Sequence, residues 1–481
     1  MSRKGPAVYN IAAGTPFVDA LASGLLRRHG GAPLALAEVT VLLPTRRACR
    51  ALREAFLRIG GGRPMLLPAM RPLGDVDEEE LALQGGDALE LAPAILPLRR
   101  QLLLTRLIRR RADFAHPAQA ALLAAELAAL LDQVQIERLD FAALQGLVPA
   151  EFAAHWQQTL EFLKIVTAQW PAILQDAGLL DPAARRNRLL EAQLARWTEA
   201  PPATPVYAAG STGSLPATAD LLRLIAWLPQ GALVLPGLDQ GLDRDSWRAL
   251  AEEPTHPQFG LQQLLNRLQI DRDEVEAWPA GEISAGDPAR MALVREAMKP
   301  AATTDSWAEV PPPPEAAIAG MLRLDAPGPQ EEAGAIALLL RQTLQQPGRT
   351  AALVTPDRGL ARRVAAELAR WGIEIDDSAG QPLAQTPPGS FLRLTAALAA
   401  SELAPVPLLA VLKHPLAAGG MARDRFRRLV RALEREVLRG PRPGGGIEGL
   451  RAAVQQEGKT AGVGAMLETL GDRVAEFLRL L

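Results

Sequence analysis

The chain has 481 residues, of which 48% are hydrophobic and only 4% aromatic, and its formal net charge is -2. A chain of this length is expected to form about three domains. Because alanine, leucine and valine supply most of the apolar volume, the composition favours a helix-rich soluble protein. The balanced charge excludes a uniformly basic polyanion-binding chain and leaves room for local basic patches.

Cysteine usage and hydropathy indicate the compartment. The single cysteine, Cys49, can form neither an intrachain disulfide nor a thiolate metal site, which favours a reducing compartment. No apolar run approaches the roughly 20 residues of a membrane span, and residues 1–10 are not followed by the apolar segment of a leader. His155 and His414 have no companions at ligand spacing, so we predict no metal site. The sequence therefore predicts a cytoplasmic protein that does not contact a membrane.

Residues 1–92 open with alternating strand-like and helix-like segments. VYNI at 8–11 and VTVLLP at 39–44 are short apolar runs typical of buried strands, and a helical pattern follows each of them. This order predicts a βαβα unit with a parallel sheet. An acidic stretch, DVDEEE at 75–80, separates this unit from the next segment.

Residues 93–199 have a different pattern, in which apolar residues recur three and four positions apart. This period predicts an all-helical insertion. Strand-like runs then return as VYAAG at 206–210 and ALVLPG at 232–237, with a helical pattern between them. Residues 200–278 are therefore predicted to complete the α/β lobe that residues 1–92 begin.

The remaining chain is predicted to contain a linker, the start of a second α/β lobe and a helical block. Residues 279–330 are rich in Pro, Ala and Gly and indicate a linker around one short helix. Residues 331–400 read as helix, strand (TAALVTPD at 350–357) and helix, and residues 401–481 form a final helical insertion. The predicted fold class is α/β, with two lobes and large all-helical insertions.

The turn after the first strand stands where a P-loop would be expected. A loop of the form GxxxxGK[ST] cradles phosphates with backbone N–H groups and reaches them with a lysine. Here only Gly14, followed by Thr15, remains, and no lysine follows. A magnesium-holding carboxylate is also missing after VYAAG, because the first acid is Asp220, well inside the next predicted helix. The pattern leaves two alternatives, a degenerate nucleotide site or a fold that never bound nucleotide.

A second triplet of P-loop type, GKT at 458–460, is predicted to be incidental. The position of the leading glycine is occupied by Ala453, and the preceding residues have a helical instead of a strand pattern.

Two predicted helices begin with a threonine and arginines directly after a strand. Hydroxyl and N–H groups at a helix start, with arginines in the first turns, suit a phosphate of a nucleic acid backbone. The candidate DNA-binding residues are Thr45, Arg46, Arg47, Arg50, Thr355 and Arg358. The alternative is an N-capped surface helix with solvated arginines, and two copies at matching positions favour the DNA interpretation. A further run of eight arginines between 423 and 442 is typical of a solvated or partner-facing helix.

Several segments together resemble one protein family. The segments are PTRRACRALREAF, RPLGDVDEEEL, HWQQTLEFL, AGSTGSLPATADLL, VLPGLD, ALVTPDRGLARRVA and WGIEIDDSAGQPLAQTPPG. In combination, and nearly end to end, the chain resembles AddB of the alphaproteobacterial type. AddB is the partner of the AddA helicase–nuclease in double-strand break repair and is functionally similar to RecBCD. The N-terminal half of the family is related to superfamily 1 helicases.

The resemblance implies two RecA-like lobes with degenerate helicase motifs. VYNIAAGTPF stands at motif I without its lysine, PTRRACRALR at motif Ia, AAGSTGSLPAT at motif II without its acidic pair, and PGLDQ near motif III. The resemblance implies a helicase-shaped body that holds single-stranded DNA and duplex ends, while AddA supplies the motor.

The same resemblance implies that this chain corresponds to the N-terminal half of the family. Family members carry a C-terminal nuclease domain with a magnesium site and a cysteine-bound iron–sulfur cluster, which a chain with one cysteine cannot reproduce. We therefore expect no cofactor in this chain. The leading hypothesis is a catalytically inactive DNA-binding subunit. The alternatives are an active DNA-dependent ATPase with a diverged loop and a scaffold that binds AddA without touching DNA.

Overall fold

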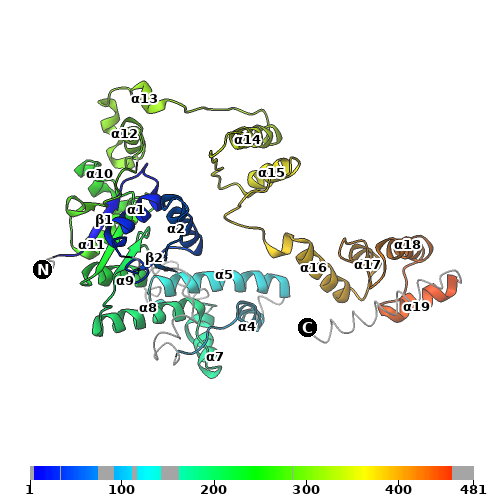
Figure 1. Ribbon diagram of the computed structural model, residues 1–481. Helices are drawn as coiled ribbons and strands as arrows, with labels where there is room; N and C mark the ends of the chain where they lie inside the picture. Colours follow the sequence, from blue (N-terminus) through cyan, green and yellow to red (C-terminus); the bar gives the residue numbers. More distant parts are fainter. Residues whose placement is uncertain are drawn as a thin grey trace. The chain divides into compact units, whose positions relative to one another are not determined.

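The structure, a computed structural model, describes residues 5–457 except for residue 33, residues 74–90, 111–115 and 142–161, and residue 284. The chain divides into two compact units, Met1–Leu322 and Arg323–Leu481 (Figure 1). Each unit is described by itself.

The first unit is built on a six-stranded sheet in which every neighbouring pair of strands is parallel. The strand order is β3-β2-β4-β5-β1-β6. The strands are β1 (Val8–Ile11), β2 (Thr40–Leu43), β3 (Ala69–Pro72), β4 (Val206–Ala209), β5 (Gly231–Pro236) and β6 (Glu276–Ala277). All residues of β1 and β4 are buried, as expected for parallel strands that helices cover on both faces. The α/β class with a parallel sheet is thus confirmed.

Successive strand residues pack into two separate cores, one on each face of the sheet. The helices of this part of the unit are α1 (Phe17–His29), α2 (Arg46–Ile59), α9 (Pro216–Trp227), α10 (Arg244–Ala249) and α11 (Phe259–Leu268). Tyr9 of β1 joins the core formed with α1 and α2, whereas its neighbour Val8 joins the core formed with α9 and α11. This alternation follows from the pleat of a strand. Figure 1 shows these helices gathered around the strands.

The connections that leave β1 and β5 run in opposite directions across the sheet. The chain passes from β1 through α1 to β2, beyond β5 and β4, whereas it passes from β5 through α10 and α11 to β6, on the other side of β1. The two connections also use opposite faces, because α1 and α11 belong to different cores. The carboxyl ends of β1 and β5 therefore form a topological switch point, where open α/β sheets bind ligands.

All the described elements between β3 and β4 are helical. They are α4 (Pro97–Arg109), α5 (Pro117–Ile136), a π-helical turn (Ile165–Gln169), α7 (Trp170–Asp176) and α8 (Pro182–Glu199). These helices have their own core around Trp170, whose Nε1 donates to Asp181 Oδ2 over 2.8 Å. Arg100 Nε lies 2.9 Å from Asp181 Oδ1, so the buried carboxylate has a cationic partner.

The stretch predicted to be a linker contains more regular structure than expected. It forms α12 (Pro288–Ala297), a 3₁₀ helix (Ala301–Ala308) and α13 (Glu315–Ile318). Arg290 Nε of α12 donates to the carbonyl of Ala317 over 3.0 Å, which ties α13 to α12.

The described residues of the second unit are helical or irregular. The helices are α14 (Pro329–Leu344), α15 (Arg358–Ala369), α16 (Pro387–Ala400), α17 (Pro405–Leu412), α18 (Arg423–Leu433), which continues as a π-helical turn (Glu434–Leu438), and α19 (Gly446–Glu457). Residues 458–481, with the GKT triplet and the end of the last predicted helical block, lie outside the described residues.

The predicted strand over residues 350–357 is not formed. A strand exists only where a neighbour accepts and donates its backbone hydrogen bonds. No backbone hydrogen bond between described residues uses residues 351–354, and Val354 is 93% exposed. The structure therefore shows one α/β sheet in the described part of the chain.

None of the described helices has both the length and the apolar character needed to span a bilayer.

Candidate functional site at the carboxyl edge of the sheet

A cavity of about 590 Å³ opens at the switch point, outside the carboxyl ends of β1 and β5. Ala12 to Gly14 line it on the β1 side and Gly237 to Leu242 on the β5 side, and α12 contributes Met291, Val294 and Arg295. The loop predicted to be a degenerate nucleotide site is therefore located where this class of sheet binds ligands.

Gly14 lies in direct contact with a segment almost three hundred residues later in the sequence. Gly14 has a φ of +80°, and a Cβ built on it would lie 3.2 Å from Gly286 Cα and 3.2 Å from Met291 Sδ. Thr15 N donates to the carbonyl of Ala12 over 3.2 Å, so the loop is a tight turn and does not form a wide cradle. The segment of residues 285–298, called here the α12 cover, packs against one side of this turn and lines the cavity beside it.

The polar side chains of the cavity wall are engaged with backbone groups of the loop after β5. Asn10 donates from Nδ2 to the carbonyl of Leu238 and accepts at Oδ1 from Leu238 N, each over 2.9 Å. Gln258 donates to Gly237 O over 2.9 Å and accepts from Asp239 N over 3.0 Å. These four bonds hold the loop in place, and they leave the cavity itself with a mainly apolar lining.

The acidic residue nearest the cavity is neutralised by the α12 cover. Arg295 Nε donates to Asp239 Oδ1 over 2.8 Å and to Oδ2 over 3.0 Å. The guanidinium lies against Gly241, where an added Cβ would come within 2.7 Å of three of its atoms. Asp239, in the segment that resembles motif III, thus acts as an anchor for α12. No group of three His, Cys, Asp or Glu side chains arranged to hold a metal ion occurs among the described residues.

The other acid considered for a nucleotide site also has a structural partner. Asp220 lies on α9, and its Oδ2 accepts from Arg138 Nη1 over 2.6 Å. Arg138 follows α5, so this contact connects the helical insertion to the sheet. Directly after β4 stands Gly210 with a φ of +76°, and a Cβ there would lie 3.3 Å from the Phe17 ring. An aromatic side chain therefore lies close to the backbone at the end of this strand.

The first predicted DNA-binding helix start lies at this same carboxyl edge. Thr45 is the N-cap of α2, directly after β2, and its Oγ1 accepts from Ala48 N over 3.1 Å. Arg46 and Arg47 occupy the exposed first turn. Arg50 is turned along the helix toward Glu54, with Nε 3.1 Å from Oε1. The structure brings Thr45, Arg46 and Arg47 to one exposed edge, while Arg50 is engaged in an ion pair within its own helix.

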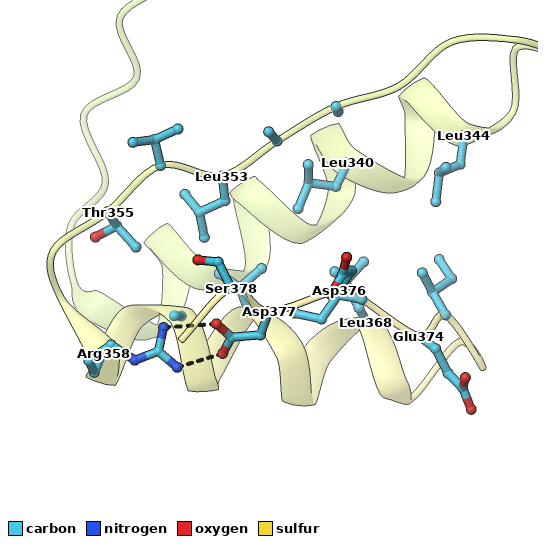
Figure 2. A pocket seen from close by; sticks show the side chains of 17 residues that line it. Leu340, Leu344, Leu353, Thr355, Arg358, Leu368, Glu374, Asp376, Asp377 and Ser378 are labelled. Atoms are coloured by element: carbon cyan, nitrogen blue, oxygen red, sulfur yellow. Dashed lines mark hydrogen bonds and ion pairs between the residues drawn. The ribbon is translucent and has the colours of Figure 1, made fainter. Parts of the chain in front are cut away.

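The second predicted helix start differs from the first (Figure 2). Its N-cap is Asp357, whereas Thr355 lies two residues earlier and accepts at Oγ1 from Asp357 N over 3.0 Å. Arg358 faces Asp377 and donates to both of its oxygens, over 3.1 and 2.5 Å. The hydrogen bonds from Arg358 lower the pKa of the Asp377 carboxyl to about 2. The guanidinium of Arg358 is therefore committed to a carboxylate of its own unit.

A cavity of about 540 Å³ lies beside this ion pair in the second unit. Figure 2 shows Leu340 and Leu344 of α14 and Leu353 of the extended segment on one side, and the run from Glu374 to Ser378 on the other. Apolar side chains form one wall, and Asp376 and Asp377 lie at the acidic end.

The sequence predicted one short helix in residues 279–330 but did not predict that a helix there covers the Gly14 turn. The signal of this helix was present, because Met291, Val294 and Met298 recur at helical spacing inside the proline-rich stretch. Composition alone favoured a linker there.

No protein-family model matches the chain, and no curated protein is significantly similar to it in sequence. The resemblance to the AddB family therefore rests on the motifs themselves.

Proposed function

We propose that the chain is a catalytically inactive, helicase-like DNA-binding subunit of a double-strand break repair complex, of the AddB type. It acts in DNA end processing and recombination beside an AddA helicase–nuclease in the cytoplasm. The observation that carries the proposal is the α12 cover, because Gly286 and Met291 pack closely against Gly14 and narrow the space that a phosphate would need at this turn.

The fold supports a helicase-like body. A parallel sheet places the Gly14 loop at its switch point, and a helical insertion interrupts the sheet domain between β3 and β4. We propose that this unit is a RecA-like lobe, and that residues 331–400 begin a second one. The body is retained because DNA is held along it, whereas the chemistry of the nucleotide site has been lost.

The DNA-binding part of the proposal rests on the carboxyl edge of the sheet. Thr45, Arg46 and Arg47 form an exposed helix start with positive charge, the arrangement that suits a backbone phosphate. Contacts of this kind carry no sequence information, so the proposed activity is to hold and pass DNA of any sequence.

Two experiments separate this proposal from its alternatives. An ATPase assay with and without single-stranded DNA is expected to show no turnover, because no lysine follows Gly14 and the α12 cover packs against this turn. DNA-stimulated turnover that a Gly14→Val variant abolishes would establish the diverged ATPase. Fluorescence anisotropy with a labelled oligonucleotide tests the remaining alternative, since a scaffold for AddA that does not touch DNA gives no salt-dependent binding.

A further inference from the structure

Helix α18 of the second unit carries a dense arginine face. Its eleven residues include five arginines and one acid, Asp424. Phe426, Val430 and Leu433 are buried in the core of the surrounding helices. At 100° per residue these three share one side of the helix, so the arginines cover the opposite side.

Four of these arginines have no partner in the described part of the chain. Side chains of the four are exposed and make no ion pair or side-chain hydrogen bond with a described residue; they are Arg425, Arg427, Arg428 and Arg431. Other exposed arginines of the same unit do have acidic partners, for example Arg370 with Glu367 and Arg451 with Glu448, each at 2.8 Å. The acid on the face, Asp424, makes no ion pair with Arg427 or Arg428.

The spacing of the face concentrates positive charge. Arg427 and Arg431 are four residues apart, and Arg425, Arg428 and Arg431 follow one another at intervals of three. Such neighbours lie about 5 to 6 Å apart on a helix, and like charges at these positions destabilise it. Solvated helix faces more often mix both signs of charge, which limits this repulsion. The repulsion on α18 is relieved when a ligand with repeated negative charges binds along it.

A nucleic acid backbone fits this face better than a lipid surface does. A backbone presents one negative charge about every 3.4 Å along a strand, and the planar guanidinium fork matches phosphate oxygens. A helix that binds a bilayer inserts its apolar face. The apolar face of α18 is not available, because Phe426 and Val430 are each 3% exposed and Leu433 is fully buried.

We infer that the face formed by Arg425, Arg427, Arg428 and Arg431 is a second contact for the DNA backbone, independent of the α2 helix start. The inference rests on the proposed function and extends it, since it assigns phosphate binding to a helix outside the sheet-bearing unit. The contact neutralises several successive phosphates and reads no base.

The test compares two variants with the same change in net charge. In the face variant, glutamine replaces Arg425, Arg427, Arg428 and Arg431; in the control, it replaces Arg248, Arg323, Arg370 and Arg451, which have acidic partners. Binding of a fluorescent 30-nucleotide single strand is followed across a salt titration. Since each phosphate contact contributes a slope of about 0.7, the face variant should flatten the slope by about two to three units. We expect it to weaken binding at least about tenfold at low salt, while the control stays within about twofold.

Each other result has a definite meaning. If the wild type binds DNA and the face variant matches the control, the inference is overturned while the proposed function stands. Absence of wild-type DNA binding overturns both. If the wild type binds anionic phosphatidylglycerol vesicles but not DNA, both the proposed function and the α18 inference are overturned in favour of a lipid partner. A variant with lysine at the four positions keeps the charge and should retain the slope of log affinity against log salt. If this variant loses the slope, the substitutions have affected folding and not only charge.

Discussion

Arginine side chains that look equivalent in the sequence have different surroundings in the structure. Arg358 donates two hydrogen bonds to Asp377 and a third, over 3.2 Å, to the carbonyl of Gly380, whereas Arg46 and Arg47 occupy an exposed first turn beside the sheet. A guanidinium held by a carboxylate must give up that partner before it can bind a phosphate. We therefore expect Arg358 to contribute little to DNA binding.

The Arg358–Asp377 pair predicts a pH dependence of stability. The pKa of Asp377 lies near 2 instead of its ordinary 3.8, because Arg358 donates to the ionised form. Since the folded-state value is the lower one, the stabilisation is present above about pH 4 and is lost as the pH falls toward about 2. Urea unfolding should show that Arg358→Gln destabilises the chain at pH 6 and that the difference from wild type vanishes near pH 2. Arg362→Gln, which leaves Asp377 untouched, is the control, and a wild-type Asp377 that titrates near 3.8 by NMR would contradict the assignment.

The α2 helix start predicts salt-sensitive DNA binding without sequence preference. Replacing Arg46 and Arg47 together by alanine should weaken binding to all single-stranded oligonucleotides alike. Because each neutralised phosphate contributes about 0.7 to the slope of log affinity against log salt, the slope should flatten by about one to one and a half units. The measurement is a salt titration of anisotropy, with circular dichroism to establish folding. An unchanged slope in a folded variant would show that these arginines are solvated side chains that do not contact DNA.

At the scale of elements, two segments with the same apolar composition differ in hydrogen bonding. Strand β4 pairs with β2 on one side and β5 on the other, so its backbone groups lie inside a ladder. Residues 351–354 are similarly apolar, but no described backbone hydrogen bond involves them. Strand formation depends on neighbours as much as on composition.

Hydrogen exchange should separate these two segments. Amides of residues 351–354 should exchange within about tenfold of the rate of an unstructured peptide, because no acceptor protects them. Amides of β4 should exchange at least about a thousandfold more slowly, since they open only with the sheet. Exchange measured by mass spectrometry on the whole chain compares both segments in one sample. Strong protection of 351–354 would mean that another segment pairs with them in solution.

The helix α12 shows how an element can decide the chemistry of a distant loop. Met291 and Arg295 of this helix contact the turn at Gly14 and the acid at Asp239, respectively. The α12 cover therefore closes one side of the Gly14 turn and supplies the cation that neutralises Asp239.

At the scale of the whole molecule, the sheet and the arginine face belong to different units. The sheet and its helical insertion lie within Met1–Leu322, whereas α18 lies within Arg323–Leu481. Two independent DNA contacts on separate units would raise the affinity through the effective concentration of the second site. A chain that carries both the α2 and the α18 substitutions should then lose more DNA affinity than a chain with either set alone.

The whole chain is also predicted to lack nuclease activity. The reason is that one cysteine cannot supply the ligands of the iron–sulfur cluster that the nuclease domain of the resembled family carries. Incubation of a linear duplex with the purified protein and Mg²⁺ or Mn²⁺ should leave it intact over hours. Nuclease activity that copurifies with the protein over successive columns at constant specific activity would contradict this prediction.

Local sequence determined the central strands and the start of α2. Four apolar runs predicted β1, β2, β4 and β5 within one or two residues, because a strand buried on both faces must be apolar throughout. The edge strands β3 and β6 were missed: β3 contains Arg71 and Pro72, and β6 has two exposed residues, so neither shows a buried pattern. The helix start at Thr45 was readable because its hydroxyl caps its own helix.

The sequence by itself also determined that no lysine follows Gly14 and that the one cysteine forms no intrachain disulfide, since these are statements about which residues are present. Only the tertiary structure decided what covers the Gly14 turn, because Gly14 and Gly286 meet through folding across 272 positions. It likewise decided that Arg358 binds Asp377 and that residues 351–354 lack a neighbour. Contacts between residues far apart depend on which faces pack together, and no local pattern of charge or hydrophobicity specifies that.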